Sequence, residues 1–326
     1  MKKRSKQSRT AAPWRSLVAG ALASFALALP QTVTAGEGGT THVIPGAMAT
    51  IVDNAPTAPG TIVKPMYLHY SGSISPQIPT AAGLASDVDA SSNTFAVAGV
   101  HTFETTVLGG AHYSVVAALP YTWLDITANV QAPGGGSVRR ESKVDGFGDL
   151  TVIPAMLAWK SGEWQFNAVL PIFAPTGSYK QGRLGNPSLN YWTFDPMVGV
   201  VYGSQKGLNA LLNAGYAMNT ENPDTNYKSG SLLHFDGAVQ QLLPVGSGFM
   251  TLGAEGFYFQ QVTCDSGSGA TLGCFKGRTA GIGPVLGYIQ PLGTQALSLE
   301  LKWLPELDTK NRLNGDYIWF KMVYKF

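Results

Sequence analysis

Charged residues are scarce in this chain of 326 residues, where Lys, Arg, Asp and Glu together make up 13%. A water-soluble enzyme usually carries about twice that fraction. Hydrophobic residues make up 44%, too many for a disordered chain, and the 39 glycines are too many for a helical bundle. The composition therefore disfavours these classes, and the length fits either two domains or one large all-β domain.

Long hydrophobic runs are also lacking. No stretch after residue 30 holds eighteen consecutive apolar residues, which excludes a multi-span helical membrane protein. Only two cysteines are present, Cys264 and Cys274, in a segment rich in Gly and Ser. We expect them to form a disulfide in an oxidising compartment, because a two-Cys metal site would have no nearby His partner.

The first 35 residues have the pattern of a cleaved signal peptide. Six basic residues and no acidic ones precede the apolar run 17–29, and Val33-Thr34-Ala35 is a small-x-small cleavage site. The run is too short to cross about 30 Å of hydrocarbon as a helix, which disfavours the alternative of an uncleaved anchor. Without residues 1–35 the chain has 22 − 6 = 16 basic and 20 acidic residues, a formal charge of −4. Nucleic-acid binding thereby loses its compositional support.

The rest of the chain alternates apolar and polar residues in segments typical of strands with one apolar face. Residues 36–60 lack this period and are expected to form an extended leader on the periplasmic side. The expected strands number twelve. They are 61–73, 93–107, 111–124, 146–159, 163–174, 191–203, 207–219, 231–243, 248–262, 278–290, 294–304 and 313–326.

Connections between the expected strands alternate strictly in length. Those after the even-numbered strands are tight turns, whereas those after the odd-numbered strands are long and hold most of the charge. Short periplasmic turns and long external loops are typical of a bacterial outer-membrane barrel. A soluble β-sandwich would have no reason to sort its loops in this way. The sequence therefore predicts an all-β fold, a transmembrane antiparallel up-and-down β-barrel over residues 61–326.

The two faces of the strands support this interpretation. In the last strand Ile318, Phe320 and Met322 share one face, while Lys321 and Lys325 share the other. Outward residues that meet lipid must be apolar, so the charged face is expected to be the interior. The alternation fails in the first two strands, where His69 or Lys64, and His101 or Glu104, could not both point inward without a bulge. Aromatic residues near strand ends suit interfacial girdles; they are Trp123, Trp159, Trp164, Tyr191, Trp192, Trp303 and Trp319.

The chain ends in Tyr324-Lys325-Phe326, which closes an alternating strand. A terminal Phe on such a strand resembles the signal that the barrel-assembly machinery reads in outer-membrane barrels. Two internal segments carry a second resemblance: Asp145-Gly146-Phe147-Gly148-Asp149-Leu150, and Ala174 to Tyr179 with Asn190-Tyr191-Trp192-Thr193-Phe194 downstream. They are similar to the outer-membrane barrels of the MetA-pathway phenol-degradation, or transporter, family. The resemblance spans most of residues 40–326 and implies an outer-membrane channel found near genes for aromatic compound catabolism, without catalytic residues.

Motifs for enzyme chemistry are weak. Gly146-Phe147-Gly148-Asp149 is followed by no helix, so it is no phosphate cradle. His234 and Asp236 share one strand face and could serve a hydrolase, but no Gly-x-Ser-x-Gly accompanies them. The five histidines have no metal-ligand spacing. We therefore expect neither an enzyme nor a cofactor or metal.

Polar residues assigned to the interior are the best candidates for function. The expected lumen-lining residues are Asp149, Asn167, Asp195, His234, Asp236, Glu255, Glu300, Lys302 and Lys321. They either line water or form cross-strand ion pairs such as Lys321 with Glu300. Acids outnumber bases among them, which favours cations or neutral solutes if a water path exists. The alternative is a plugged lumen whose charges merely pair.

We therefore predict an exported outer-membrane channel for passive uptake of small molecules, aromatic or hydrophobic ones included. Twelve strands should enclose a narrow space, and residues 36–60 or an external loop are expected to fold inward as a constriction. Its expected partners are outer-membrane lipid, the barrel-assembly machinery and a small solute. The alternatives are a structural or adhesive barrel that binds a surface partner through its loops and, third, an outer-membrane hydrolase that uses His234 and Asp236.

Overall fold

The computed structural model describes residues 40–80, 83–132, 135–271, 273–274 and 276–326. Strands dominate this part of the chain, whose one helical element is the 3-10 turn η1 (Ile51–Asp53). Within these ranges no helix is long and apolar enough to cross a membrane. The predicted signal peptide, residues 1–35, lies outside the described residues.

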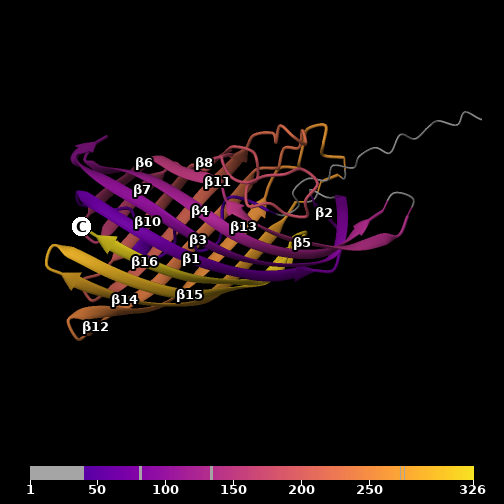
Figure 1. Cartoon of the computed structure of the whole chain (residues 1–326). Helices are drawn as coiled ribbons and strands as arrows, with labels where there is room; N and C mark the ends of the chain where they lie inside the picture. Colours follow the sequence, from indigo (N-terminus) through magenta and orange to yellow (C-terminus); the bar gives the residue numbers. More distant parts are fainter. Residues whose placement is uncertain (1–39, 81–82, 133–134, 272, 275) are drawn as a thin grey trace, which may run out of the picture. The chain divides into compact units, whose positions relative to one another are not determined.

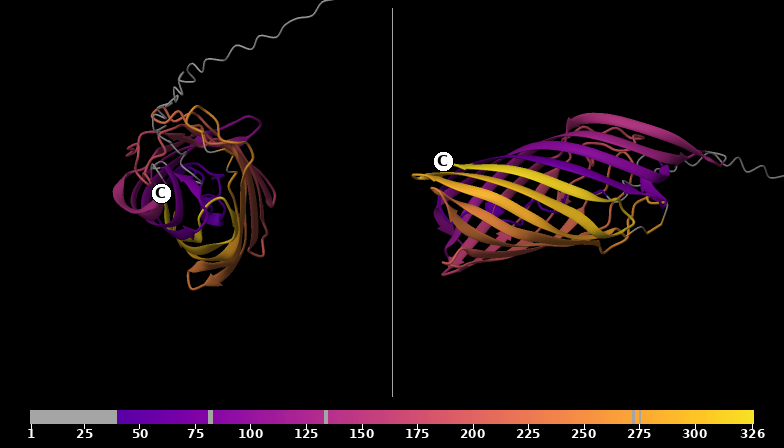
Figure 2. Two further views of the ribbon diagram at one scale, coloured as in Figure 1. Left: turned by 90° about the vertical axis from the view of Figure 1, so that its right-hand side faces the viewer. Right: turned by 90° about the horizontal axis from the view of Figure 1, so that it is seen from below.

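Twelve antiparallel strands form a closed barrel, as the sequence predicts (Figures 1 and 2). Nine of them are continuous: β1 (Gly60–Ile74), β3 (Gly83–Val107), β4 (Ala111–Gln131), β11 (Leu208–Asn219), β12 (Leu232–Val245), β13 (Gly248–Gln261), β14 (Arg278–Leu292), β15 (Gln295–Lys310) and β16 (Asn314–Lys325). The other three are interrupted pairs: β5 (Ser137–Phe147) with β6 (Leu150–Ser161), β7 (Trp164–Val169) with β8 (Ile172–Ala174), and β9 (Thr193–Phe194) with β10 (Met197–Gly203). β16 pairs with β1 and closes the ring. The short strand β2 (Ile78–Thr80) pairs with β3.

The interruptions have local causes. Pro171 separates β7 from β8, and Pro196 separates β9 from β10. Proline has no N–H to donate, so the ladder breaks at these positions. The break at Gly148 and Asp149 is different, because β5 pairs only with β4, whereas β6 pairs with β4, β7 and β8. Beyond this break the second edge of β5 has no neighbouring strand.

The expected loops after the first and third strands are wrong in extent. β3 begins at Gly83 rather than at residue 93, so Asp87 and Asp89 lie in a strand. β4 continues to Gln131, and β5 contains Arg139, Arg140, Glu141 and Lys143 as a further stretch of hairpin. The charged residues predict loops here, but the strands continue past the apolar band as a ribbon with polar side chains. In Figure 1 this ribbon and β2 lie at the end of the barrel opposite the short turns and the C-terminus.

Outward and inward faces differ in the predicted sense. Large apolar side chains are exposed on the outside of every part of the wall, among them Phe95, Leu119, Phe166, Val198, Leu212, Val239, Ile282 and Leu301. Such an exterior suits lipid, since lipid imposes no cost on apolar surface. Lys64 points inward and His69 outward, so β1 needs no bulge. In β3 the register shifts between Thr102 and Thr106, which is the irregularity expected near His101 and Glu104.

Two members of the expected aromatic girdle are misassigned. Trp319 is 6% exposed and donates Nε1–H to the carbonyl oxygen of Pro45 inside the barrel. Tyr191 is also buried and contacts the ring of His42. A position near a strand end predicts a place in the girdle, but the face of the strand on which a side chain lies decides whether it meets lipid.

Candidate functional site

A cavity of about 520 Å³ lies inside the barrel. One side of it is the inner face of β1, β3, β4 and β6, which presents mainly small or apolar side chains: Ile62, Met66, Leu68, Val88, Ala90, Ala96, Ala98, Val100, Val116, Ala118, Ile126, Ile153 and Met156. The other side is a chain segment rather than a strand. We call residues 40–59, which precede β1, the lumen segment.

The lumen segment is held largely through its backbone, because it forms no sheet. The carbonyl oxygen of Gly46 accepts hydrogen bonds from Lys302 Nζ at 2.6 Å and Lys321 Nζ at 2.8 Å. Lys321 Nζ also donates to the carbonyl oxygen of Ala47 at 3.0 Å. The Gly46 N–H points at Asp236 Oδ1, 3.4 Å away. Lysine donors from the wall thus replace the hydrogen bonds that an irregular buried backbone would otherwise lack.

Gly46 is required at its position. Its φ is +84°, a left-handed conformation that residues with a side chain rarely adopt. A Cβ at this residue would lie 2.7 Å from Leu304 Cδ1 and 2.8 Å from Trp319 Nε1. The chain can therefore pass close to the β15–β16 wall only where a glycine stands.

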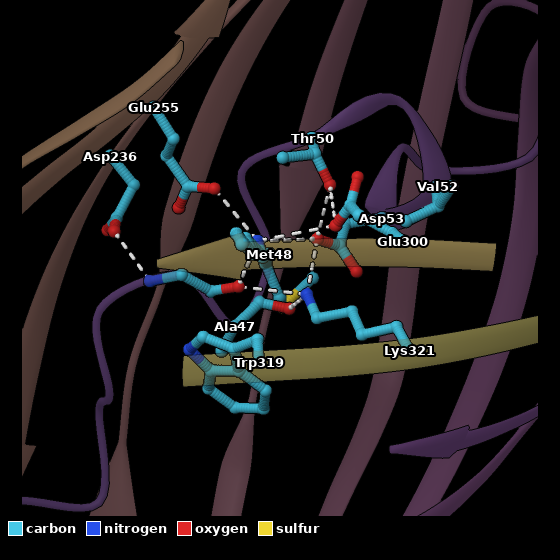
Figure 3. Close-up of polar contacts among 12 residues, drawn as sticks. Ala47, Met48, Thr50, Val52, Asp53, Asp236, Glu255, Glu300, Trp319 and Lys321 are labelled. Carbon is cyan, nitrogen blue, oxygen red and sulfur yellow. Dashed lines mark hydrogen bonds and ion pairs between the residues drawn. The ribbon is translucent and has the colours of Figure 1, made fainter. Parts of the chain in front are cut away.

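Asp53, at the end of η1, is the centre of a buried ion-pair network (Figure 3). Its carboxylate lies 2.6 Å from Lys321 Nζ, 3.0 Å from Lys64 Nζ and 3.6 Å from Lys302 Nζ. Its side chain is wholly buried. Burial by itself would raise the pKa of Asp53, but the positive charges of Lys321, Lys64 and Lys302 outweigh it and hold the pKa well below its usual range.

Two further carboxylates complete the network. Glu255 Oε2 lies 2.8 Å from Lys302 Nζ, and Glu300 Oε1 lies 3.5 Å from the same nitrogen. The hydroxyl oxygen of Thr50 lies 2.8 Å from Glu300 Oε1 and 2.9 Å from Asp53 Oδ2. With Asp53, the three carboxylates match the three lysines in charge. A buried set of this kind is tolerable only when each charge is paired, so the lumen segment supplies a charge that the wall needs.

Nearer the loop end, Asp149 joins the lumen segment to the broken part of the wall. Asp149 Oδ2 lies 2.8 Å from His42 Nε2 and accepts from the Leu189 N–H at 2.9 Å. Asp149 Oδ1 accepts from the Gly177 N–H at 3.0 Å. Residues 175–192 therefore pack against the break between β5 and β6, and residues 184–189 of this loop line the cavity.

His234 lies between two carboxylates on the inner wall. Its Nε2 is 2.9 Å from Asp195 Oδ1, and its Nδ1 is 3.4 Å from Asp236 Oδ2. The imidazole is fully buried. Because each ring nitrogen already faces a carboxylate, neither is positioned to activate a nucleophile, and the arrangement suits a structural role.

In the part of the chain that the structure describes, no group of three or more His, Cys, Asp or Glu side chains is arranged to hold a metal ion. The acidic groups of the lumen are occupied by lysines, by His42 and His234, and by backbone N–H groups.

Residues 72–322 match the family described as "Putative MetA-pathway of phenol degradation". The match covers most of the barrel, from β1 into β16. This chain belongs to that family. The family resemblance drawn from Asp145–Leu150 and the segments after Ala174 is thereby confirmed. No curated protein sequence shows a significant match to this family member.

Solved outer-membrane structures superpose on this chain to different degrees. The COG4313 outer membrane channel from Pseudomonas putida F1 superposes with a TM-score of 0.61 at 16% identity, covering 87% of this chain and 100% of that one. The β domain of the Bordetella autotransporter BrkA gives a TM-score of 0.45 at 13% identity, over 82% and 100% of the two chains. The transport unit of the Escherichia coli autotransporter AIDA-I gives 0.47 at 10% identity, over 82% and 90%. At these identities the first comparison shows the shared fold alone.

The nine residues predicted to line the lumen are all buried, but they fall into four groups. Glu255, Glu300, Lys302 and Lys321 belong to the Asp53 network, and Asp195, His234 and Asp236 form a second group. Asp149 joins His42, and Asn167 donates to the side chain of Asn54. In place of the expected ion pair between Lys321 and Glu300, Lys321 pairs with Asp53, and Glu300 lies beside Lys302.

Three side chains that contribute contacts between the lumen segment and the wall were not among the predicted residues. Asp53 and His42 precede the first strand in an aperiodic segment, so no face could be assigned to them. Lys64 was noticed only as a conflict with His69, although its position two residues from Met66 on one strand face places both inward.

The remaining predicted features lie at the two ends of the barrel. Cys264 and Cys274 form a disulfide with an S–S distance of 2.09 Å, in the loop between β13 and β14. The loop stands at the end opposite the short turns. Tyr324 and Phe326 lie at the turn end, and the Phe326 N–H donates to the carbonyl oxygen of Thr61 on β1. Their predicted role as an assembly signal stays a prediction.

Proposed function

We propose that this chain is a passive channel of the bacterial outer membrane for one small, largely apolar molecule at a time. The observation that carries the proposal is the cavity of about 520 Å³ with its apolar wall on β1, β3 and β4. A ligand site of that size falls in the range of about 300–1,000 Å³ common for small molecules. The apolar exterior places the barrel in lipid, and the bacterial channel with a similar fold supports this location.

Chemistry of the lumen favours an uncharged solute. The charges of the Asp53 network are paired with one another and with backbone carbonyl oxygens of the lumen segment. The network therefore exerts only a weak electrostatic attraction on a passing ion. The side chains around the free space are mainly small and apolar, although Asp53, Lys64 and the group of Asp195, His234 and Asp236 also border it. A count of the predicted acids and bases alone favours cations or neutral solutes. With Asp53 and Lys64 included, the Asp53 network holds three carboxylates and three lysines.

The lumen segment acts as a plug in this proposal. It lies across the lumen from His42 to Asn54, with contacts to Asp149 in the break before β6 and to β7, β12, β15 and β16. Transport down a gradient then requires that the segment move or that the solute pass between it and the β1–β3–β4 wall. Residues 36–39 of the predicted leader, residues 36–60, lie outside the described residues.

An enzymatic role is not part of the proposal. The hydrolase alternative needs His234 as a general base, and both of its ring nitrogens face a carboxylate. The family match and the similar channel fold also favour transport.

Uptake by intact cells tests the function. Lipopolysaccharide makes the outer membrane a barrier to apolar dyes, so cells with and without the chain are compared for the rate at which N-phenyl-1-naphthylamine fluorescence rises. Uptake of radiolabelled arabinose, measured in a strain that lacks the porins through which arabinose enters, is the control for a polar solute. We expect faster dye entry and unchanged sugar entry. Faster sugar entry with unchanged dye entry would show a general polar pore, and no change in either would sink the channel itself.

A further inference from the structure

The ribbon at the loop end of the barrel has an open strand edge. β5 pairs with β4 along one side, and within the described residues no strand pairs with its other side. The loop of residues 175–192 meets that side at its barrel end, where the Ser178 N–H donates to the carbonyl oxygen of Phe147 at 2.7 Å. Residues 137–145 continue beyond this contact, away from the apolar band (Figure 1).

The backbone of β5 presents hydrogen-bonding groups along the open edge. The N–H and C=O groups of successive residues point alternately to the two sides of a strand. The carbonyl oxygen of Gly136 accepts from Ala132, on the β4 side, whereas that of Phe147 accepts from Ser178, on the open side. The odd-numbered residues from 139 to 145 therefore direct both groups to the open edge, which is a template for a further strand.

The same odd-numbered residues carry charges of alternating sign. They are Arg139, Glu141, Lys143 and Asp145, which share one face of β5 and are all exposed. In the reverse direction the positive and negative charges exchange places, so the pattern is its own complement in an antiparallel pair. Charges that protect an edge repel an incoming strand of the same sequence, whereas these charges attract it.

One register satisfies both the backbone and the charges. In this register Ser142 lies opposite Ser142 of a second copy, and Arg139 faces Asp145 of that copy. Glu141 faces Lys143 in the same way, and the two-fold axis repeats both contacts. The odd-numbered residues then form the hydrogen-bonded pairs of the ladder, as their backbone direction requires. An axis at Glu141 or at Lys143 would instead place like charges opposite each other.

The direction of β5 determines in which membrane the second copy lies. The strand runs from the outer part of the ribbon to Phe147, next to the break at which β6 takes over the pairing with β4. Antiparallel partners run in opposite directions, so the second barrel lies at the other end of the paired strands, in a facing membrane. Two copies in one membrane would pair in parallel about a two-fold axis, with each charge beside its like.

We propose that the open edge of β5 joins two copies of this chain from facing outer membranes, through antiparallel pairing of residues 139–145. The ion pairs within the chain leave room for the new partners. Arg139 lies 3.5 Å from Asp89 and Lys143 lies 3.3 Å from Asp125, yet the two basic side chains remain 54% and 68% exposed. The inference is independent of the channel function, because residues 139–145 do not line the cavity.

Clustering of proteoliposomes tests the pairing. The full chain is reconstituted in phosphatidylcholine vesicles that carry a donor or an acceptor dye, and energy transfer between the two populations reports contact. Glu141→Lys should abolish the transfer, because each contact with Lys143 would then join two positive charges. Glu141→Lys/Lys143→Glu keeps the pattern self-complementary and should restore the transfer. Asp224→Lys makes the same change of charge in the exposed loop between β11 and β12, and should leave the transfer unchanged.

Cross-linking tests the register. Cys264 and Cys274 are the only cysteines and are bonded to each other, so an introduced cysteine is the single free thiol. Ser142→Cys lies on the two-fold axis in a non-hydrogen-bonded pair, where a Cα–Cα distance of about 4.5 Å suits a disulfide. Mild oxidation should therefore link this variant into a dimer. Arg140→Cys should stay monomeric, because its counterpart lies about 13 Å away along the strand.

Three outcomes would overturn the inference, provided that each variant shows the mobility shift on boiling of a folded barrel. Transfer that persists in Glu141→Lys, or that the double variant fails to restore, would remove the charge pairing. Equal cross-linking of Ser142→Cys and Arg140→Cys would indicate parallel pairing within one membrane. Neither vesicle clustering nor a Ser142→Cys dimer would show that the edge does not bind a second copy. Dye uptake measures the channel separately, so none of these results decides the proposed function.

Discussion

Asp53 offers the most direct test of the plug, because one carboxylate serves three lysines. Replacing it with Ala removes its contacts of 2.6 Å to Lys321, 3.0 Å to Lys64 and 3.6 Å to Lys302. Three lysines would then share only Glu255 and Glu300. Removing one partner from a buried ion pair costs about 3–5 kcal/mol. In the unplugged state the lumen segment has left and water can solvate the three lysines. The cost of the missing carboxylate therefore falls on the plugged state, in which the lysines stay buried.

Single-channel recording in planar bilayers measures the consequence. A cost of about 3–5 kcal/mol changes an equilibrium by a factor of about 10² to 4 × 10³, since each 1.4 kcal/mol is a factor of ten. Openings that are rare in the unmodified channel should therefore dominate the record of Asp53→Ala. A deletion of residues 40–58 gives the conductance of the fully open barrel. Asp125→Ala is the matched control, because this acid is half exposed on the outer wall and pairs with exposed Lys143.

The result can refute the reasoning in two distinct ways. If the deletion conducts and Asp53→Ala stays closed, other contacts such as His42 with Asp149 hold the segment. The Asp53 network then stabilises the plugged state by less than about 3 kcal/mol. If the deletion itself conducts no better than the unmodified chain, the lumen segment is no plug.

Three further predictions concern the plug and the chain end. Gly46→Ala should raise open probability in the same recordings, because its φ of +84° and the close approach of Leu304 exclude a Cβ; Gly109→Ala, in an open turn, is the control, and equal traces would contradict it. Acid should release the plug only well below pH 4. The pKa of Asp53 is depressed in the folded protein, so the stabilisation that its carboxylate gives is fully present above about pH 3.9, the pKa of a free Asp. This stabilisation is lost as the pH falls through the depressed pKa. Conductance should therefore stay low from pH 7 to pH 4, and opening near pH 6 would contradict this assignment. Deleting Phe326 should reduce the heat-modifiable, membrane-inserted form seen on unboiled gels relative to deleting exposed Leu108 in a turn, and equal amounts of both would remove its role as an assembly signal.

Strand number and wall chemistry were predictable from the sequence, because both are local. A side-chain period of two in β12, β15 and β16 assigns each residue to a face without knowledge of its neighbours. The tight turns at Gly109, Gly162, Gly246 and Gly293 mark strand ends in the same way. Charge was the weaker guide, as the strand β5 shows, because a strand that continues past the lipid keeps its hydrogen bonds and changes only its side chains.

Pairing inside the lumen could not be predicted in the same way. Lys321 and Glu300 are direct neighbours in the β15–β16 register, so a cross-strand pair was the natural expectation. The carboxylate that Lys321 binds belongs to Asp53, more than 250 residues earlier. Nothing in the spacing of Asp53 assigns it to a face, because its segment has no period.

The sequence by itself determined a lipid-facing barrel of twelve strands, since apolar and polar residues alternate wherever hydrogen-bonded neighbours are required. Only the tertiary structure decided what the barrel contains. The lumen segment lies inside, where it gives three wall lysines a carboxylate and backbone carbonyl oxygens. The cavity that remains is the volume between that segment and the small side chains of β3 and β4, and a volume of this kind is a property of surfaces that meet only after folding.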